Sequence, residues 1–223
     1  MTWSLRGRID HTVRESLPDW MDPLVNVVDG IEAEQVTSFV PQPGNGRHSA
    51  VLILFSPQRE LVLIERAHNS STHSGQTAFP GGVVEPQDSG TAAAALREAE
   101  EETGLNPTGV VTFGELPDLW IPISNFVVSP ILGYWQEPSP LSVMDPREVA
   151  SVHRVPIDEF VNPSNRIRIS HPSGYIGNAF NVSDLVVWGF TGGLISTLLD
   201  LTGWAQPWDQ SRIRPLAEVV DFP

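Results

Sequence analysis

Three things are scarce in this sequence of 223 residues: cysteine, lysine and long hydrophobic runs. The absence of cysteine excludes disulfide bonds, thiolate zinc sites and thiol nucleophiles. All 13 basic residues are arginine, so a Walker-type lysine and Schiff-base chemistry have no residue to act through. A chain without cysteine suits a reducing compartment, and we therefore expect a cytoplasmic location.

No segment has the hydrophobic pattern of a targeting or membrane-spanning sequence. The N-terminal MTWSLRGRID lacks the apolar core of a signal peptide, so secretion is not expected. The most apolar late stretch, residues 185–201, contains Trp-Gly and Gly-Gly and is flanked by Asp184 and Asp200. It is short and interrupted for a membrane span, and a buried helix is the expected structure.

Positive charge is also in short supply, because 27 acidic residues give a formal net charge of −14. Surfaces that bind nucleic acid need clustered basic side chains to neutralise phosphates, so no nucleic-acid partner is expected. A phosphorylated small molecule would be repelled in the same way. An anionic substrate therefore requires a metal ion to supply local positive charge.

Length and an apolar content of 40% are sufficient for one domain with a sizeable core. We expect a single domain made of a core at 46–202, an N-terminal extension at 1–45 and a C-terminal tail at 203–223. Strands and helices mix without the regular alternation of a doubly wound sheet. The pattern predicts an α/β fold in which helices cover both faces of a mixed sheet.

Apolar runs and turn residues predict the individual elements. Short helices are expected within 1–40 and a loop at 41–46. Two strands that could form a hairpin are expected at 49–56 and 61–66, followed by a loop at 67–78. Further strands are expected at 109–116, 126–135 and 166–171, with a loop containing Trp120 between the first two. Residues 148–160 predict a strand leading into a short helix, and 185–201 a long helix.

The most informative element is a helix predicted at 91–103 that ends at Gly104, a residue suited to a C-terminal cap. At about 100° per residue, Glu98, Glu101 and Glu102 share one face of this helix, while Glu100 points elsewhere. The three carboxylates lie at the rim of an apolar stripe that faces the core, formed by Ala92, Ala95, Leu96, Ala99 and Thr103.

Carboxylates three and four residues apart repel one another and raise one another's pKa values. Arg97 can reach Glu101 at i+4, but a single guanidinium does not neutralise three carboxylates. One or more Mg²⁺ ions with oxygen ligands would do so. The preceding Gly81-Gly82 turn allows a ligand to approach the backbone closely. The alternative for an acidic run of this kind is an ordinary solvated helix surface.

Residues 97–105, REAEEETGL, follow the order Arg-Glu, apolar, any, Glu-Glu, any, Gly, apolar. In this the sequence resembles the Nudix hydrolases, whose box carries a Gly and a Glu ahead of that run. The first half departs from the box, since Asp88 stands where Glu is usual and Arg97 lies one residue late. The resemblance implies a Nudix-type α/β/α sandwich, with Glu98, Glu101 and Glu102 as catalytic and metal-binding residues for Mg²⁺ or Mn²⁺.

A second motif, RAHNSSTHSGQTAFPGG at 66–82, is similar to the signature of the coenzyme A diphosphatase branch of that family. Ser71 stands where the signature has a second Arg, which puts the substrate in question. The stretch VWGFTGGLI at 187–195 also looks like the C-terminal helix of that branch, so the resemblance covers roughly 47–200. The motif nominates these residues for substrate binding: Arg66, Gly75, Phe79, Gly81 and Gly82, with His73 and Gln76 beside Gly75.

The resemblance also suggests that Glu148 returns to the metal site from another element, although an ordinary surface Glu is the commoner case. Glu101 or Glu148 would accept the proton of the attacking water. The implied reaction splits coenzyme A or an acyl-coenzyme A into 3′,5′-ADP and a phosphopantetheine. Two alternatives remain: another nucleoside diphosphate derivative as substrate, such as ADP-ribose, NADH, a dinucleotide or a damaged nucleoside triphosphate, and a non-catalytic nucleotide sensor. Oligomeric state stays open.

Overall fold

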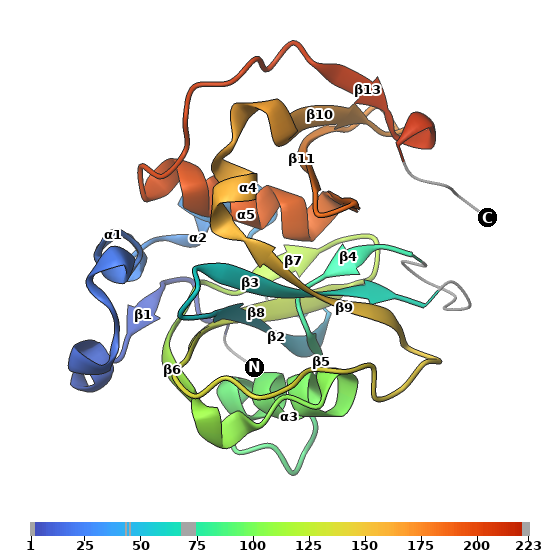
Figure 1. Ribbon diagram of the computed structural model, residues 1–223. Coiled ribbons are helices and arrows are strands. Elements are labelled where there is room, and N and C mark those ends of the chain that lie inside the picture. The colour runs from blue at the N-terminus through green and yellow to red at the C-terminus, as the bar shows by residue number, and fades with distance from the viewer. Residues whose placement is uncertain (1–2, 43, 45, 68–74, 220–223) are drawn as a thin grey trace.

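A computed structural model of the chain describes residues 3–42, 44, 46–67 and 75–219. Two sheets and five α-helices are stacked, with helix α3 on one side of the larger sheet and helix α5 with the smaller sheet on the other (Figure 1). The α/β class, the mixed sheet and the helices on both faces are confirmed. None of the helices in the described part of the chain is long and apolar enough to cross a membrane.

The larger sheet has nine strands, and its main path runs β1-β6-β8-β2-β3-β4. Its centre is the parallel pair of β2 (Arg47–Phe55) and β8 (Phe126–Trp135), while the other pairs are antiparallel. The remaining strands are β1 (Arg8–Ile9), β3 (Glu60–Arg66), β4 (Thr77–Ala78), β5 (Gly81–Val83), β6 (Val110–Glu115), β7 (Leu119–Ile121) and β9 (Val149–Pro156).

Alternation along β2 separates two parts of the core, because successive side chains of a strand point to opposite faces. Ala50, Leu52 and Leu54 pack under α3 (Thr91–Thr103), whereas Ile53 and Phe55 belong to the larger cluster on the α5 side. The α3 side is lined by small residues of the helix itself: Ala94, Ala95 and Ala99 are fully buried. Helix α3 therefore lies very close to the sheet.

The smaller sheet has the order β12-β11-β10-β13 and is formed by the C-terminal third of the chain. Its strands are β10 (Arg166–Ser170), β11 (Ile176–Val182), β12 (Leu185–Val187) and β13 (Ile213–Pro215), and α5 (Gly189–Leu201) packs on β11. The other helices are α1 (Asp22–Val28), α2 (Ala33–Val36) and α4 (Ile157–Val161). Short 3-10 helices are η1 (His11–Ser16), η2 (Asp19–Met21), η3 (Pro107–Gly109), η4 (Pro163–Asn165) and η5 (Leu216–Glu218).

Most predicted elements are confirmed, including α3 with its left-handed cap at Gly104 (φ 68°) and the β2–β3 hairpin. Four predictions were wrong. The loop predicted at 67–78 ends in strand β4, which pairs with β3. The loop containing Trp120 is partly strand β7, which pairs with the start of β8. The Gly81-Gly82 turn is strand β5, paired with β2. The helix predicted from residue 185 begins at Gly189, because residues 185–187 pair with β11 before the chain turns at a glycine with φ 63°.

Candidate active site

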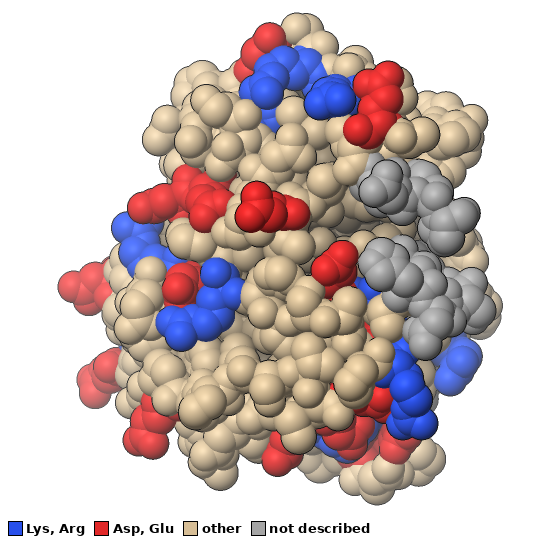
Figure 2. Space-filling view, turned by 45° about the vertical axis from the view of Figure 1, so that its right-hand side comes forward, with Lys and Arg blue, Asp and Glu red and all other residues tan. Residues whose placement is uncertain are grey.

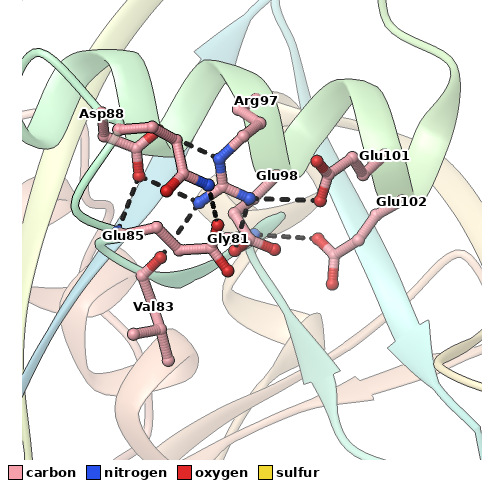
Figure 3. A network of polar contacts seen from close by, with 9 residues as sticks. Gly81, Val83, Glu85, Asp88, Arg97, Glu98, Glu101 and Glu102 are labelled. Carbon is pink, nitrogen blue, oxygen red and sulfur yellow. Dashed lines mark hydrogen bonds and ion pairs between the residues drawn. The ribbon is translucent and has the colours of Figure 1, made fainter.

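The acidic cluster, formed by Glu98, Glu101 and Glu102, lies where α3 crosses the Gly81–Gly82 segment of β5 (Figure 3). A Cβ atom on Gly82 would lie 2.4 Å from Cδ of Glu98, so the carboxylate occupies the space that a side chain would need. The backbone N–H of Gly81 donates to Oε2 of Glu102 at 2.9 Å. Both glycines thus bring the backbone of β5 up to the carboxylates of α3, which gives a physical role to two of the predicted site residues.

Glu102 is only 4% exposed and lies inside the buried stripe of α3 rather than at its rim, where the helical wheel put it. The rim prediction failed because Gly82 has no side chain to hold α3 away and the backbone N–H of Gly81 reaches Glu102, so the helix packs closely against β5. Burial raises the pKa of Glu102 to about 8, although the Gly81 N–H and the charge of Arg66 act in the opposite direction. Burial also raises the pKa of Glu98, whose hydrogen bond to Arg97 acts against it.

Arg97 is bonded to carboxylates on both sides (Figure 3). Its Nε and Nη2 donate to the two carboxylate oxygens of Asp88, each at 3.0 Å, and Nη2 also donates to the carbonyl of Val83. Its Nη1 donates to Glu98 at 3.0 Å and to Glu101 at 3.1 Å. The guanidinium holds the pKa of Asp88 below its usual value.

The pairing of Asp88 with Arg97 was not predicted, although the position of Asp88 in the box was a signal for it. A bidentate pair of this kind fixes both partners in one plane, so the guanidinium is oriented before it meets Glu98 and Glu101. The loop between Asp88 and Arg97 is longer than in the strict box. The two side chains still pair, because both also bond to the backbone at the end of β5 or just after it. The departures from the strict box spacing therefore leave this pairing intact.

Arg66 and Glu148 approach the same cluster from β3 and from the residue before β9. The charge of Arg66 lowers the pKa of Glu102, and the charge of Glu148 raises the pKa values of both Glu98 and Glu102. The carbonyl of Glu148 accepts from the N–H of Ala67, which ties the two segments together. Glu148 therefore lies near enough to act on both carboxylates, and its role at the metal site stays a prediction.

Nε of Arg66 is buried and has no hydrogen-bond partner among the described residues. A buried guanidinium N–H without an acceptor is costly, and an anionic group bound at the cluster would satisfy it. Gly75, with φ 67°, donates its N–H to the carbonyl of Arg66, and Gln76 accepts from the Arg66 N–H. The signature residues around Gly75 therefore hold the backbone of Arg66.

One nominated residue lies in the core and another cannot be placed. Phe79 is 2% exposed and packs in the large core cluster on the α5 side, so it anchors the segment that leads into β5. His73, like Ser71, lies outside the described residues.

The predicted ligands Glu98, Glu101 and Glu102 suit a hard divalent cation, since all their donor atoms are carboxylate oxygens. In the described residues no three His, Asp or Glu side chains already stand as a ligand set. Nη1 of Arg97 is bonded to Glu98 and Glu101. A cation would have to take Glu98 away from Arg97, and the bond to Asp88 would keep Arg97 in place as this occurs.

The comparisons with known proteins agree with this geometry. A family model described as "NUDIX domain" matches residues 46–173. The chain is 34% identical to "Uncharacterized Nudix hydrolase NudL" of Yersinia enterocolitica over 167 residues, which is 71% of this chain and 85% of that protein. It is 40% identical to the protein of the same description from Photorhabdus laumondii over 124 residues, which is 54% of this chain and 65% of that protein.

Among solved structures, the chain is similar to a Nudix hydrolase from M. smegmatis, RenU. The TM-score is 0.48 with 19% identity, and the match covers 74% of this chain and 94% of that chain.

The close approach of Gly82 to Glu98 yields a first prediction. Gly82→Ala forces the Glu98 carboxylate out of its place. Millimolar Mg²⁺ should raise the melting temperature of the wild type, and this rise should be largely lost in the variant. The fold itself should survive, because a side-chain end can turn away. Gly193→Ala, where an added Cβ meets nothing within 4 Å, is the control and should keep the full Mg²⁺ effect. An unchanged Mg²⁺ effect in Gly82→Ala would contradict the role of Glu98.

The raised pKa of Glu102 yields a second prediction, for the protein in EDTA. Between pH 4.5 and about 8 the folded state keeps a proton on Glu102 that the unfolded chain has lost, so the free energy of unfolding falls as pH rises through this range. Glu102→Gln removes this dependence. It should match the wild type near pH 4 and exceed it by at least about 1 kcal/mol near pH 9 in urea titrations. A wild-type–variant difference that stays constant with pH would show that Glu102 has an ordinary pKa.

Proposed function

The chain belongs to the NUDIX domain family of hydrolases, and on that premise we propose that it cleaves the diphosphate bond of coenzyme A or an acyl-coenzyme A with a divalent cation. The products would be 3′,5′-ADP and phosphopantetheine or its acyl derivative. The observation that carries the proposal is the meeting of Arg66 with Glu98, Glu102 and Glu148 at one cluster. Arg66 is also the first residue of the coenzyme A signature.

Glu98 and Glu102, one helical turn apart, would hold the cation, with Glu101 and Glu148 near them. A bound Mg²⁺ or Mn²⁺ would supply the positive charge that a chain with a net charge of −14 does not offer to a diphosphate. Glu102 binds a proton when no cation is present at neutral pH, because its pKa is about 8. A cation and a proton therefore compete for this carboxylate. Because the carboxylate is buried, only a strongly charged partner displaces the proton.

Arg66 would bind a phosphate oxygen of the substrate through its Nε–H, which has no hydrogen-bond partner among the described residues. Glu148 is the better supported base for the attacking water, since it is exposed and carries no ion pair among the described residues. Glu101 is the weaker candidate, because its carboxylate, 59% exposed, already accepts from Arg97 at 3.1 Å. Because the charge of Glu148 acts on both Glu98 and Glu102, its carboxylate would lie beside the cation site.

A second candidate function is hydrolysis of another nucleoside diphosphate derivative, such as ADP-ribose or NADH. Ser71 favours it, because the signature of the coenzyme A branch has an Arg at this position. A non-catalytic sensor has less support, since the carboxylates Glu98, Glu101 and Glu102 are all present. The discriminating experiment is a panel of coenzyme A species, ADP-ribose, NADH and nucleoside triphosphates with Mg²⁺, in which products are identified by mass.

The roles of the carboxylates can be separated on a single helix. Glu98→Gln and Glu102→Gln should each lower kcat by about 10³-fold, equivalent to about 4 kcal/mol, because each removes a charged ligand. Glu100→Gln is the matched control: Glu100 is exposed and points away from the cluster, so its rate should stay near that of the wild type. Equal losses in all three variants, or none, would refute the assignment of Glu98 and Glu102.

The substrate is tested at Ser71. A missing charge-assisted phosphate contact is worth roughly 1.5 to 3 kcal/mol, or about ten- to a hundredfold in affinity, so coenzyme A should be cleaved with weak apparent binding. Ser71→Arg should raise kcat/KM for coenzyme A by a factor in that range. The gain should be smaller for dephospho-coenzyme A if the new side chain binds the 3′-phosphate. Cleavage of ADP-ribose or a dinucleotide without any cleavage of coenzyme A would disprove the coenzyme A proposal and leave the family chemistry standing.

A further inference from the structure

A second arginine is buried without full hydrogen bonding, far from the acidic cluster in sequence and on the smaller sheet. Arg166 of β10 is 1% exposed. Its Nη2 donates to Oγ of Ser196 on α5 at 2.8 Å and lies 3.5 Å from Oδ1 of Asp200, whose side chain is 56% exposed. Its Nε and Nη1 are buried and have no hydrogen-bond partner among the described residues.

Two aromatic rings hold this guanidinium in place. The Cζ atom of Arg166 lies 5.5 Å from the ring centre of Phe180 and 4.8 Å from that of Trp208. Ring faces attract the cation but accept little from the in-plane N–H groups, which still need acceptors. Since Asp200 is the only carboxylate paired with Arg166 among the described residues, the positive charge is under-compensated for a buried group.

A second guanidinium lies two residues along the same strand face. Register places Arg166 opposite Phe180 and Arg168 opposite Asn178 on β11, so both arginines share the face that packs toward α5. Asn178 donates to the same Ser196 hydroxyl that Arg166 uses. The side chain of Arg168 is half-buried and makes no ion pair within the described ranges. Two like charges held this close favour an anion between or beside them.

An open pocket of about 440 Å³ reaches the Trp208 ring that lies over Arg166, and it is lined by Pro163, Ser164, Pro207, Trp208, Asp209 and Arg212. Trp208, which covers Arg166, thus also forms a wall of the pocket. Nη1 of Arg212 is bonded to the carbonyls of Pro163 and Ser164, so the side chain is fixed across the pocket. Asp209 adds a negative charge to the lining, but its Oδ1 already accepts from Ser211.

Arginine is concentrated in this part of the chain: four of the 13 arginines, at positions 166, 168, 212 and 214, lie in or next to β10 and β13. Figure 2 shows basic side chains gathered over the end of the molecule that the smaller sheet occupies, with acidic groups at their flanks. An anionic ligand is therefore less repelled here than by a surface with the average charge of this chain.

The geometry points to a second ligand site on the smaller sheet, which binds the phosphate group of a nucleoside monophosphate through Arg166 and Arg168 and stacks its base on Trp208. The flat apolar wall formed by Trp208 and two prolines suits the planar base. The guanidinium N–H groups without partners among the described residues suit the phosphate oxygens. This site shares no residue with the diphosphate site around Glu98.

The test is calorimetric titration of the full chain with AMP in EDTA, which leaves the diphosphate site without its cation. Arg168→Met should weaken AMP binding at the second site by about tenfold or more, and Trp208→Leu should do the same. Arg214→Met is the matched control, because Arg214 is half exposed and its pair with Glu218, at 3.6 Å, lies on the surface. Arg168 is chosen over Arg166 because it is less buried and its loss should leave the fold intact.

Inorganic phosphate, ribose 5-phosphate and adenosine serve as the further probes. Ribose 5-phosphate should bind more weakly than AMP in the wild type and should lose less affinity than AMP on Trp208→Leu, since it has no base to stack on the ring. Binding of AMP that is equal in the wild type, Arg168→Met and Arg214→Met would overturn the proposal. So would AMP binding that only Arg66→Met removes, because this would place all of it at the diphosphate site.

Discussion

The approach of helix α3 to the sheet is the constraint on which the candidate site depends. Alanines at positions 94, 95 and 99 leave no large side chain to hold the helix away, and Gly81 and Gly82 leave none on the strand beneath it. Glu102 is buried as a result, and burial raises its pKa to about 8. The ionised form of a carboxylate buried in this way is stabilised most by a partner of concentrated positive charge. A divalent cation is such a partner.

Arg97 stabilises the cluster of carboxylates when no cation is bound. Its bidentate pair with Asp88 fixes the guanidinium, and the remaining N–H groups reach Glu98 and Glu101. The same side chain can therefore neutralise Glu98 in one state and release it in another without moving its anchor. Nε of Arg66 is also buried, but it has no such hydrogen-bond partner among the described residues. Arg97 is therefore a structural arginine, whereas Arg66 is suited to bind a substrate.

Much of this could be predicted from the sequence, because the relevant signals are local. The period of Glu98, Glu101 and Glu102 fixes their common face, and Gly104 ends the helix where a left-handed residue is needed. What failed depended on partners distant in the chain. The burial of Glu102 follows from Gly81 lying against it, and the strand at 185–187 follows from pairing with β11. Asp88 could have been paired with Arg97 from its place in the box, but the shifted spacing concealed the contact. Arg166 left no signal, since its burial is a matter of Phe180 and Trp208 meeting around it.

The central claim is that the buried carboxylates of α3 form a cation site from which Arg97 is displaced. A crystal structure of the protein soaked with Mn²⁺, read from the anomalous scattering of the metal, tests it most directly. The account predicts a peak at about 2.1 to 2.2 Å from carboxylate oxygens of both Glu98 and Glu102, with Arg97 still paired to Asp88 and no longer bonded to Glu98. A peak on exposed carboxylates alone, with the bond between Arg97 and Glu98 retained, would contradict it.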